Sequence, residues 1–84
     1  SSMETAMKDK IAEAIQLRKS NKPEEAMSLL ASLLKSDPNS PEINYQMAWT
    51  YDFMGKESEA VPYYENAIAY GLKDDRLGAM LGLG

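Results

Sequence analysis

The fold of this chain is decided by PEINYQMAWTYDFMGKESEAVPYYENAIAYGLKD, residues 41–74. Pro41 suits the first position of a helix, where its missing N–H has no partner to lose, and Ser40 before it can cap that helix. Gly55 and Gly71 suit the ends of this helix and of a second one expected over residues 57–70, because glycine adopts the left-handed backbone that follows many helices. Apolar residues recur three and four positions apart in both segments: Ile43, Met47, Ala48, Tyr51 and Met54, then Ala60, Tyr63, Tyr64, Ala67 and Ile68. This spacing puts them on one face of each helix and predicts an antiparallel helix pair with a short turn.

A related pattern lies 34 residues earlier in the chain. Four positions are identical at this offset, namely Ala14 and Ala48, Lys22 and Lys56, Glu25 and Glu59, and Ala26 and Ala60. Average residue frequencies alone would produce about two identities, so the physical classes of the residues carry the argument. Small residues recur beside large ones, as in Ala26 with Leu30, and Asn21 falls where Gly55 ends the later helix. Such alternation lets two helices approach closely, so residues 4–19 and 23–36 are expected to form a similar helix pair.

These residues resemble the tetratricopeptide repeat family. The match is closest in residues 41–74, through Met47-Ala48, Tyr51, Gly55, Ala60, Tyr64 and Ala67, and residues 7–40 match through Ala14, Leu17, Ala26, Leu30, Leu33 and Asp37-Pro38-Asn39. The resemblance implies an all-α fold of about five helices, with antiparallel helix-turn-helix units stacked as a short right-handed α-solenoid. Its parts would be an N-terminal tail or tag remnant (1–6), unit 1 (7–40), unit 2 (41–74), and the first helix of a truncated third unit or a capping helix (75–84).

Three kinds of departure from the family pattern involve four residues. Lys10 and Asn44 replace the aromatic residue usual near the start of each first helix, and Leu72 replaces a closing proline. Glu13 occupies a normally apolar interface position. A terminal repeat often has a more polar outer surface, which accounts for Lys10, Asn44 and Glu13.

Composition argues against several classes of function. Cysteine and histidine are absent, so the chain lacks the usual thiolate nucleophile, the usual base near neutral pH and the commonest zinc ligands. The formal charge is −4, and residues 41–84 hold seven acidic against three basic side chains, which disfavours nucleic acid as a partner. We therefore expect no cofactor and no metal, and a protein or peptide partner of basic or amphipathic character.

The adjacent carboxylates Glu24-Glu25 and Asp74-Asp75 fit helix N-termini better than a catalytic pair. An enzyme using carboxylates only is the remote alternative. No apolar run approaches the length of a membrane span and no signal-peptide pattern opens the chain, so we expect a cytoplasmic protein without a membrane partner.

The resemblance also implies where a partner binds. In stacked units of this family the first helix of each pair lines the concave surface, and helical spacing places eight residues there: Lys8, Ile11, Ile15, Arg18, Glu42, Tyr45, Trp49 and Asp52. Ile11, Ile15, Tyr45 and Trp49 would form an apolar and aromatic groove for a peptide or helix. The alternative is that Tyr45 and Trp49 pack between units as core. Some family members grip chaperone C-termini through Lys and Asn, but Ile11, Ile15 and Gln46 stand at those places, so that clamp is missing.

The last segment predicts a second function, oligomerisation. Leu77, Met80, Leu81 and Leu83 have no following helix to cover them, and a repeat array generally needs about three units. Either the natural protein continues past Gly84, or a second copy covers this surface in a homodimer, with or without exchange of helices.

Overall fold

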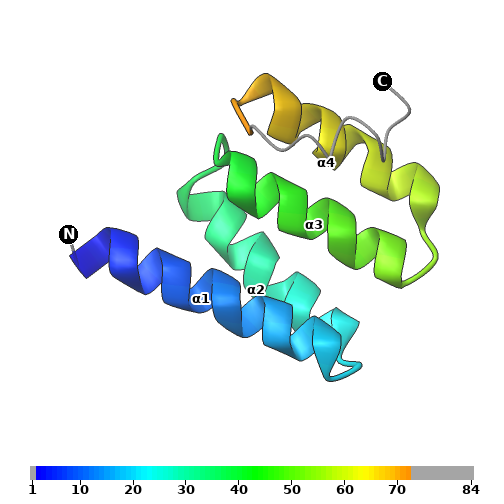
Figure 1. The fold of residues 1–84 in the computed structure, drawn as a ribbon, viewed down its shortest axis with the longest axis horizontal. Helices are drawn as coiled ribbons and strands as arrows, with labels where there is room; N and C mark the ends of the chain where they lie inside the picture. The colour runs from blue at the N-terminus through cyan, green and yellow to red at the C-terminus, as the bar shows by residue number, and fades with distance from the viewer. Residues whose placement is uncertain (1, 73–84) are drawn as a thin grey trace.

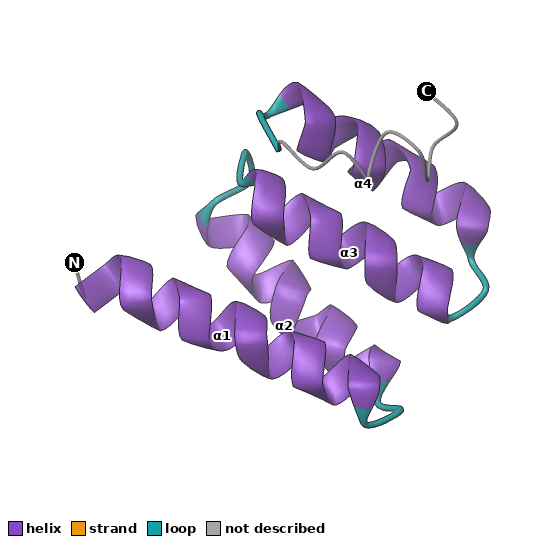
Figure 2. Ribbon diagram, in the orientation of Figure 1, coloured by secondary structure: helices purple, strands orange, loops and turns teal. Residues whose placement is uncertain are grey.

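The computed structural model describes residues 2–72, and these residues form four helices and no strand. The helices are α1 (Ser2–Lys19), α2 (Pro23–Ser36), α3 (Pro41–Phe53) and α4 (Glu57–Ala69). Consecutive helices run antiparallel, and α1 and α3 run in the same direction (Figures 1 and 2). The expected all-α class is confirmed, while the fifth helix expected within residues 75–84 lies outside the described residues.

The expected tail is corrected by the start of α1. The helix begins at Ser2, so that residues 2–6 are helical and extend the first helix of the unit. Glu4 lies in the first turn, where a carboxylate is stabilised by the helix dipole. The side chain of Met7, one turn further on, packs against the core between α1 and α2.

Three of the helices end in the same way, as the turn residues predict. Asn21, Gly55 and Gly71 have φ of 64°, 77° and 108°. Around Asn21 two backbone bonds close the end of α1, from Asn21 N to the Arg18 carbonyl at 3.0 Å and from Lys22 N to the Leu17 carbonyl at 2.8 Å. The equivalent pair of bonds follows α3 and α4. This is the Schellman arrangement, which satisfies carbonyls that a helix end leaves without a partner.

The link between α2 and α3 is held differently, through Asn44. Ser40 caps α3 by accepting a hydrogen bond from Ile43 N at 3.2 Å, as expected. Asn44 is 1% exposed, and its Nδ2 donates to the carbonyls of Ser40 (2.8 Å) and Pro38 (3.2 Å). Asn44 therefore belongs to the interior, and our expectation that it marks a polar outer surface is wrong.

The core has two clusters that meet on α3. One joins α3 to α4 through Ala48, Ala60, Tyr64 and Ala67, and the other joins α1, α2 and α3 through Ala14, Leu30, Ile43 and Met47. Helix α3 contacts each of the other three helices and lies between α1 and α4 in Figure 1. The alanines let the helices approach, and Leu30 and Tyr64 fill the space beside them. The small and large residues recognised in the sequence are therefore the core.

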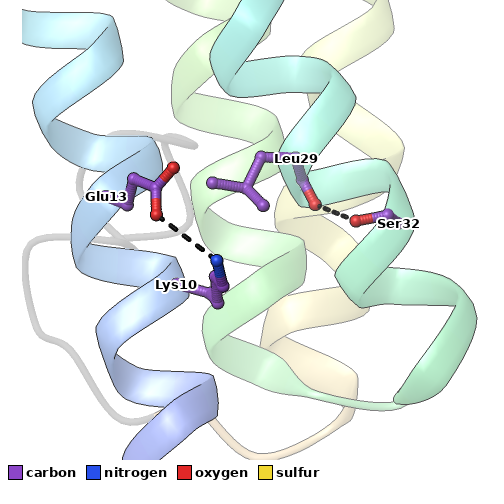
Figure 3. Close-up of polar contacts among 4 residues, drawn as sticks. All are labelled: Lys10, Glu13, Leu29 and Ser32. Atoms are coloured by element: carbon purple, nitrogen blue, oxygen red, sulfur yellow. Dashed lines mark hydrogen bonds and ion pairs between the residues drawn. The ribbon is translucent and has the colours of Figure 1, made fainter.

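The outer face of α1 is polar. Lys10 Nζ lies 3.6 Å from Glu13 Oε1, with both side chains more than half exposed (Figure 3). On the neighbouring helix α2, which Figure 3 also shows, Ser32 Oγ donates a hydrogen bond to the Leu29 carbonyl at 2.8 Å. Glu13 is therefore not in an interface between helices, contrary to the position that the family pattern assigns to it.

Candidate functional site

A groove runs between the C-terminal half of α1 and the part of α3 from Tyr45 to Phe53. It has a volume of about 660 Å³, and we call it the aromatic groove. Helix α1 contributes Ile15, Arg18 and Lys19, and α3 contributes Tyr45, Gln46, Trp49 and Phe53. Trp49 is 36% exposed and Phe53 is 47% exposed, so both aromatic faces are open to a ligand. Side chains of this kind commonly anchor protein interfaces.

A second opening lies at the N-terminal end of the same face. It has a volume of about 410 Å³, and we call it the acidic hollow. Its lining comes from α1 (Met3, Glu4, Met7, Lys8 and Ile11), from the end of α2 and the link after it (Ser36, Asp37 and Ser40), and from Glu42 at the start of α3. The side chains of Met3, Met7 and Ile11 give it an apolar surface. It also carries three carboxylates and one ammonium group.

The eight residues expected on this face divide between the two openings. Ile15, Arg18, Tyr45 and Trp49 line the aromatic groove, and Lys8, Ile11 and Glu42 line the acidic hollow. Asp52 lines neither of them. The expected oligomer contacts Leu77, Met80, Leu81 and Leu83 lie outside the described residues.

Trp49, Tyr45 and Ile11 differ in whether they line an opening, pack against the core, or do both. Trp49 belongs to neither core cluster and faces the groove. Tyr45 lines the groove and also packs against the cluster that joins α3 to α4, while Ile11 packs against the cluster that joins α1, α2 and α3. Tyr45 and Ile11 therefore join the open surface to the core.

Arg18 forms the floor of the aromatic groove. Only 9% of this residue is exposed, and its Nη1 donates to Gln46 Oε1 at 2.8 Å and, at 3.4 Å, to Thr50 Oγ1. Its Cζ lies 5.5 Å from the centre of the Trp49 ring, a cation–π distance. Burial lowers the pKa of Arg18, an effect that the nearby Tyr64 and Tyr45 partly oppose. Arg18 thus connects α1 to α3 and also supplies positive charge beneath Trp49.

Asp52 is turned towards α4. The Tyr64 hydroxyl donates to Asp52 Oδ2 at 2.6 Å, and the Tyr64 ring lies 6.1 Å from that of Tyr45. Burial raises the pKa of Tyr64, and the hydrogen bond to Asp52 raises it further. Asp52 is therefore occupied in joining α3 to α4, which explains why it does not line the groove.

Three residues that line the aromatic groove were not among the eight expected ones. Phe53 follows Trp49 by four positions, so the helical spacing that selected Trp49 also points to Phe53. Lys19 likewise follows Ile15 by four positions. The signal for Gln46 is the family resemblance, which puts it at one of the positions that grip a ligand in other members. Its place in this groove depends on the bond to Arg18 from another helix.

Neither a metal-binding cluster nor a membrane-spanning helix is found among the described residues. Within residues 2–72 no three Asp or Glu side chains are grouped closely enough to hold a metal ion. In the same part of the chain, none of the helices has the length and apolar character needed to cross a membrane.

Comparison with known proteins identifies one family. The family model described as tetratricopeptide repeat matches residues 17–83. A search of curated proteins and a search of solved structures found no significant match.

Proposed function

The chain belongs to the tetratricopeptide repeat family, and from this premise we propose that it binds a peptide or a helix of another protein in the aromatic groove. Repeats of this family generally mediate protein–protein interactions and typically act as non-catalytic scaffolds. The two helices that contribute to the groove, α1 and α3, are the first helices of the two units, which is where the family resemblance places a ligand.

One observation carries the proposal: aromatic side chains that the core does not need border an open groove. Trp49 and Phe53 are more than a third exposed although both are large and apolar. Covering them with a partner would remove roughly 100–200 Å² of apolar area from water, worth about 3–5 kcal/mol before the cost of association. That gain is concentrated at two neighbouring side chains, as in an interface with a small central anchor.

The remaining alternatives have less support. Oligomerisation through Leu77, Met80, Leu81 and Leu83 concerns residues outside the described part of the chain. An enzyme would need a catalytic carboxylate in a pocket, but the carboxylates of the acidic hollow, on Glu4, Asp37 and Glu42, all belong to exposed residues. We therefore retain peptide binding as the proposed function.

The proposal is tested by selecting binders from a displayed library of random 15-residue peptides and measuring their affinities by fluorescence anisotropy. Trp49→Ala should weaken the selected peptides at least tenfold, since an aromatic anchor typically contributes 2 kcal/mol or more. The matched control is Tyr70→Ala, which removes an aromatic side chain 41% exposed at the end of α4, outside both openings. Circular dichroism checks that both variants keep their helices. Unchanged affinity in a folded Trp49→Ala variant would refute the proposal.

A further inference from the structure

The two openings form one continuous binding face. Ile11 and Ile15 lie on successive turns of α1, the first in the acidic hollow and the second in the aromatic groove. On α3, Glu42 lines the acidic hollow and Tyr45, one turn further on, lines the aromatic groove. Because α1 and α3 run in the same direction (Figure 1), both acidic ends fall together and both aromatic ends fall together. An elongated ligand in the groove therefore reaches the hollow.

The aromatic end of this face is positively charged. Arg18 and Lys19 are its charged residues, and neither Asp nor Glu lines it. Within residues 2–72, the Arg18 guanidinium has neutral hydrogen-bond partners, Gln46 and Thr50, and no carboxylate within ion-pair distance. The residue as a whole is nine-tenths buried, and a buried charge without a counter-ion is costly. A carboxylate on the ligand would supply that counter-ion and a charge-assisted bond.

The opposite end is negatively charged. Glu4, Asp37 and Glu42 surround an apolar floor that includes Met7. Lys8 is the one basic residue among them. A lysine or arginine side chain suits such a site, because its aliphatic stem covers apolar surface while its charged end reaches the carboxylates.

We propose that this face binds a peptide with segregated charges, carrying Lys or Arg at the end over the acidic hollow and Asp or Glu at the end beside Arg18 and Lys19. An apolar or aromatic side chain between the two ends occupies the groove beside Trp49. The order of the charges then fixes the direction in which the peptide lies. This inference rests on the proposed function and specifies the partner.

The helix geometry gives the spacing of the charges. Glu4 and Lys19 are fifteen positions apart on α1, a separation of about 22 Å at 1.5 Å per residue. An extended peptide spans that distance in about six or seven residues, and a helical one in about fifteen. The basic and the acidic residue of the bound peptide should therefore be separated by one of these two numbers of residues.

The test uses the same 15-residue library on the full chain and on a charge-swapped variant, Glu42→Lys with Lys19→Glu. Both residues are exposed, and their net charge is unchanged by the swap. The matched control is Glu25→Lys with Lys35→Glu, which exchanges the same charges between the first and last turns of α2, away from both openings. This control reproduces any effect of the swap on helix dipoles.

Peptides selected by the wild-type chain should share one charge order. The swap leaves two carboxylates against two ammonium groups in the hollow and one charge of each sign in the groove, so the swapped variant should select peptides without a charge order. The swap should also weaken wild-type binders about tenfold, with less effect at high salt, while the control leaves them unchanged. If the swapped variant unfolds, Glu42→Gln with Lys19→Gln replaces it. This variant keeps Glu4, Asp37 and Lys8 in the hollow and Arg18 in the groove, so it should select the wild-type charge order less strongly. Selection of the wild-type order by the swapped variant, its selection by the Gln variant as strongly as by the wild type, or selection of no order by the wild type would overturn the inference. Binding that survives Trp49→Ala, or no enrichment at all, would instead refute the proposed function.

Discussion

The hydrogen bond between Arg18 and Gln46 should couple the two repeat units energetically, and a double-mutant cycle measures that coupling. Arg18→Met removes the guanidinium and keeps an unbranched stem, while Gln46→Leu removes the acceptor of the 2.8 Å bond. Both residues are at least nine-tenths buried, so neither group regains full solvation when its partner is lost.

The magnitudes follow from the burial and the charge. Gln46→Leu leaves a buried guanidinium whose remaining hydrogen bond to the described residues is the 3.4 Å one to Thr50, so a loss of about 2–3 kcal/mol is expected. Arg18→Met leaves the Gln46 amide without its donor and removes the contact with Trp49, for about 1–2 kcal/mol. The double variant has no buried charge left to desolvate, so it should be more stable than the sum of the single losses predicts by about 1.5–3 kcal/mol.

Urea denaturation followed by circular dichroism gives the four free energies of unfolding. With a slope near 1 kcal/mol per molar urea, a coupling of this size corresponds to a difference of about 1.5–3 M in the summed midpoint shifts. The exposed pair Lys10–Glu13, in Figure 3, serves as the control and should show a coupling of at most about 0.5 kcal/mol. If the Arg18 and Gln46 losses add to within about 0.5 kcal/mol, the bond does not join the units energetically and our account of Arg18 is refuted.

Three further predictions test the core, a buried tyrosine and a turn. Leu30→Ala, at a fully buried position, should lower the free energy of unfolding by about 2–5 kcal/mol in urea denaturation, and a loss below 1 kcal/mol would contradict its place in the core. The raised pKa of Tyr64 means that the folded chain keeps a proton which the unfolded chain loses near pH 10, so stability should fall as pH rises above about 10. Tyr64→Phe should flatten that fall in urea titrations between pH 9 and 11, whereas an unchanged slope would assign it to other groups. Gly55 has φ of 77° and open space where a methyl group would be added, so Gly55→Ala should lower the free energy of unfolding by about 1–2 kcal/mol through backbone strain alone. The melting temperature should then fall by about 4–16 °C. An unchanged melting temperature would show that the turn relaxes to accept the alanine.

Much of the site could be predicted from the sequence, because helical spacing places residues on faces. Trp49, Tyr45 and Ile15 were expected together and line the same groove. Phe53 obeys the same spacing and could have been included. The spacing could not show that the face has two openings, because the acidic hollow also needs Asp37 and Ser40 from the link between α2 and α3.

Asn44 and Asp52 show why a face assignment is insufficient for polar residues. The sequence predicts a surface position for each of them. In the structure each makes a hydrogen bond that turns its side chain away from the predicted surface. A polar side chain is directed by the partner it can reach, and the partner of Asp52, Tyr64, is twelve residues away on another helix.

The sequence by itself determined the four helices, the turns that join them and the core between them, although not the start of α1. These features depend on local backbone preference and on the 3.6-residue period, which Pro41, Gly55 and the recurring alanines express within a few residues. Only the tertiary structure decided how α1 lies against α3, and with it the place of Arg18 beneath Trp49 and the separation of charge along the binding face. Those contacts join residues about thirty positions apart, so they arise from the packing of whole helices and leave no period in the chain.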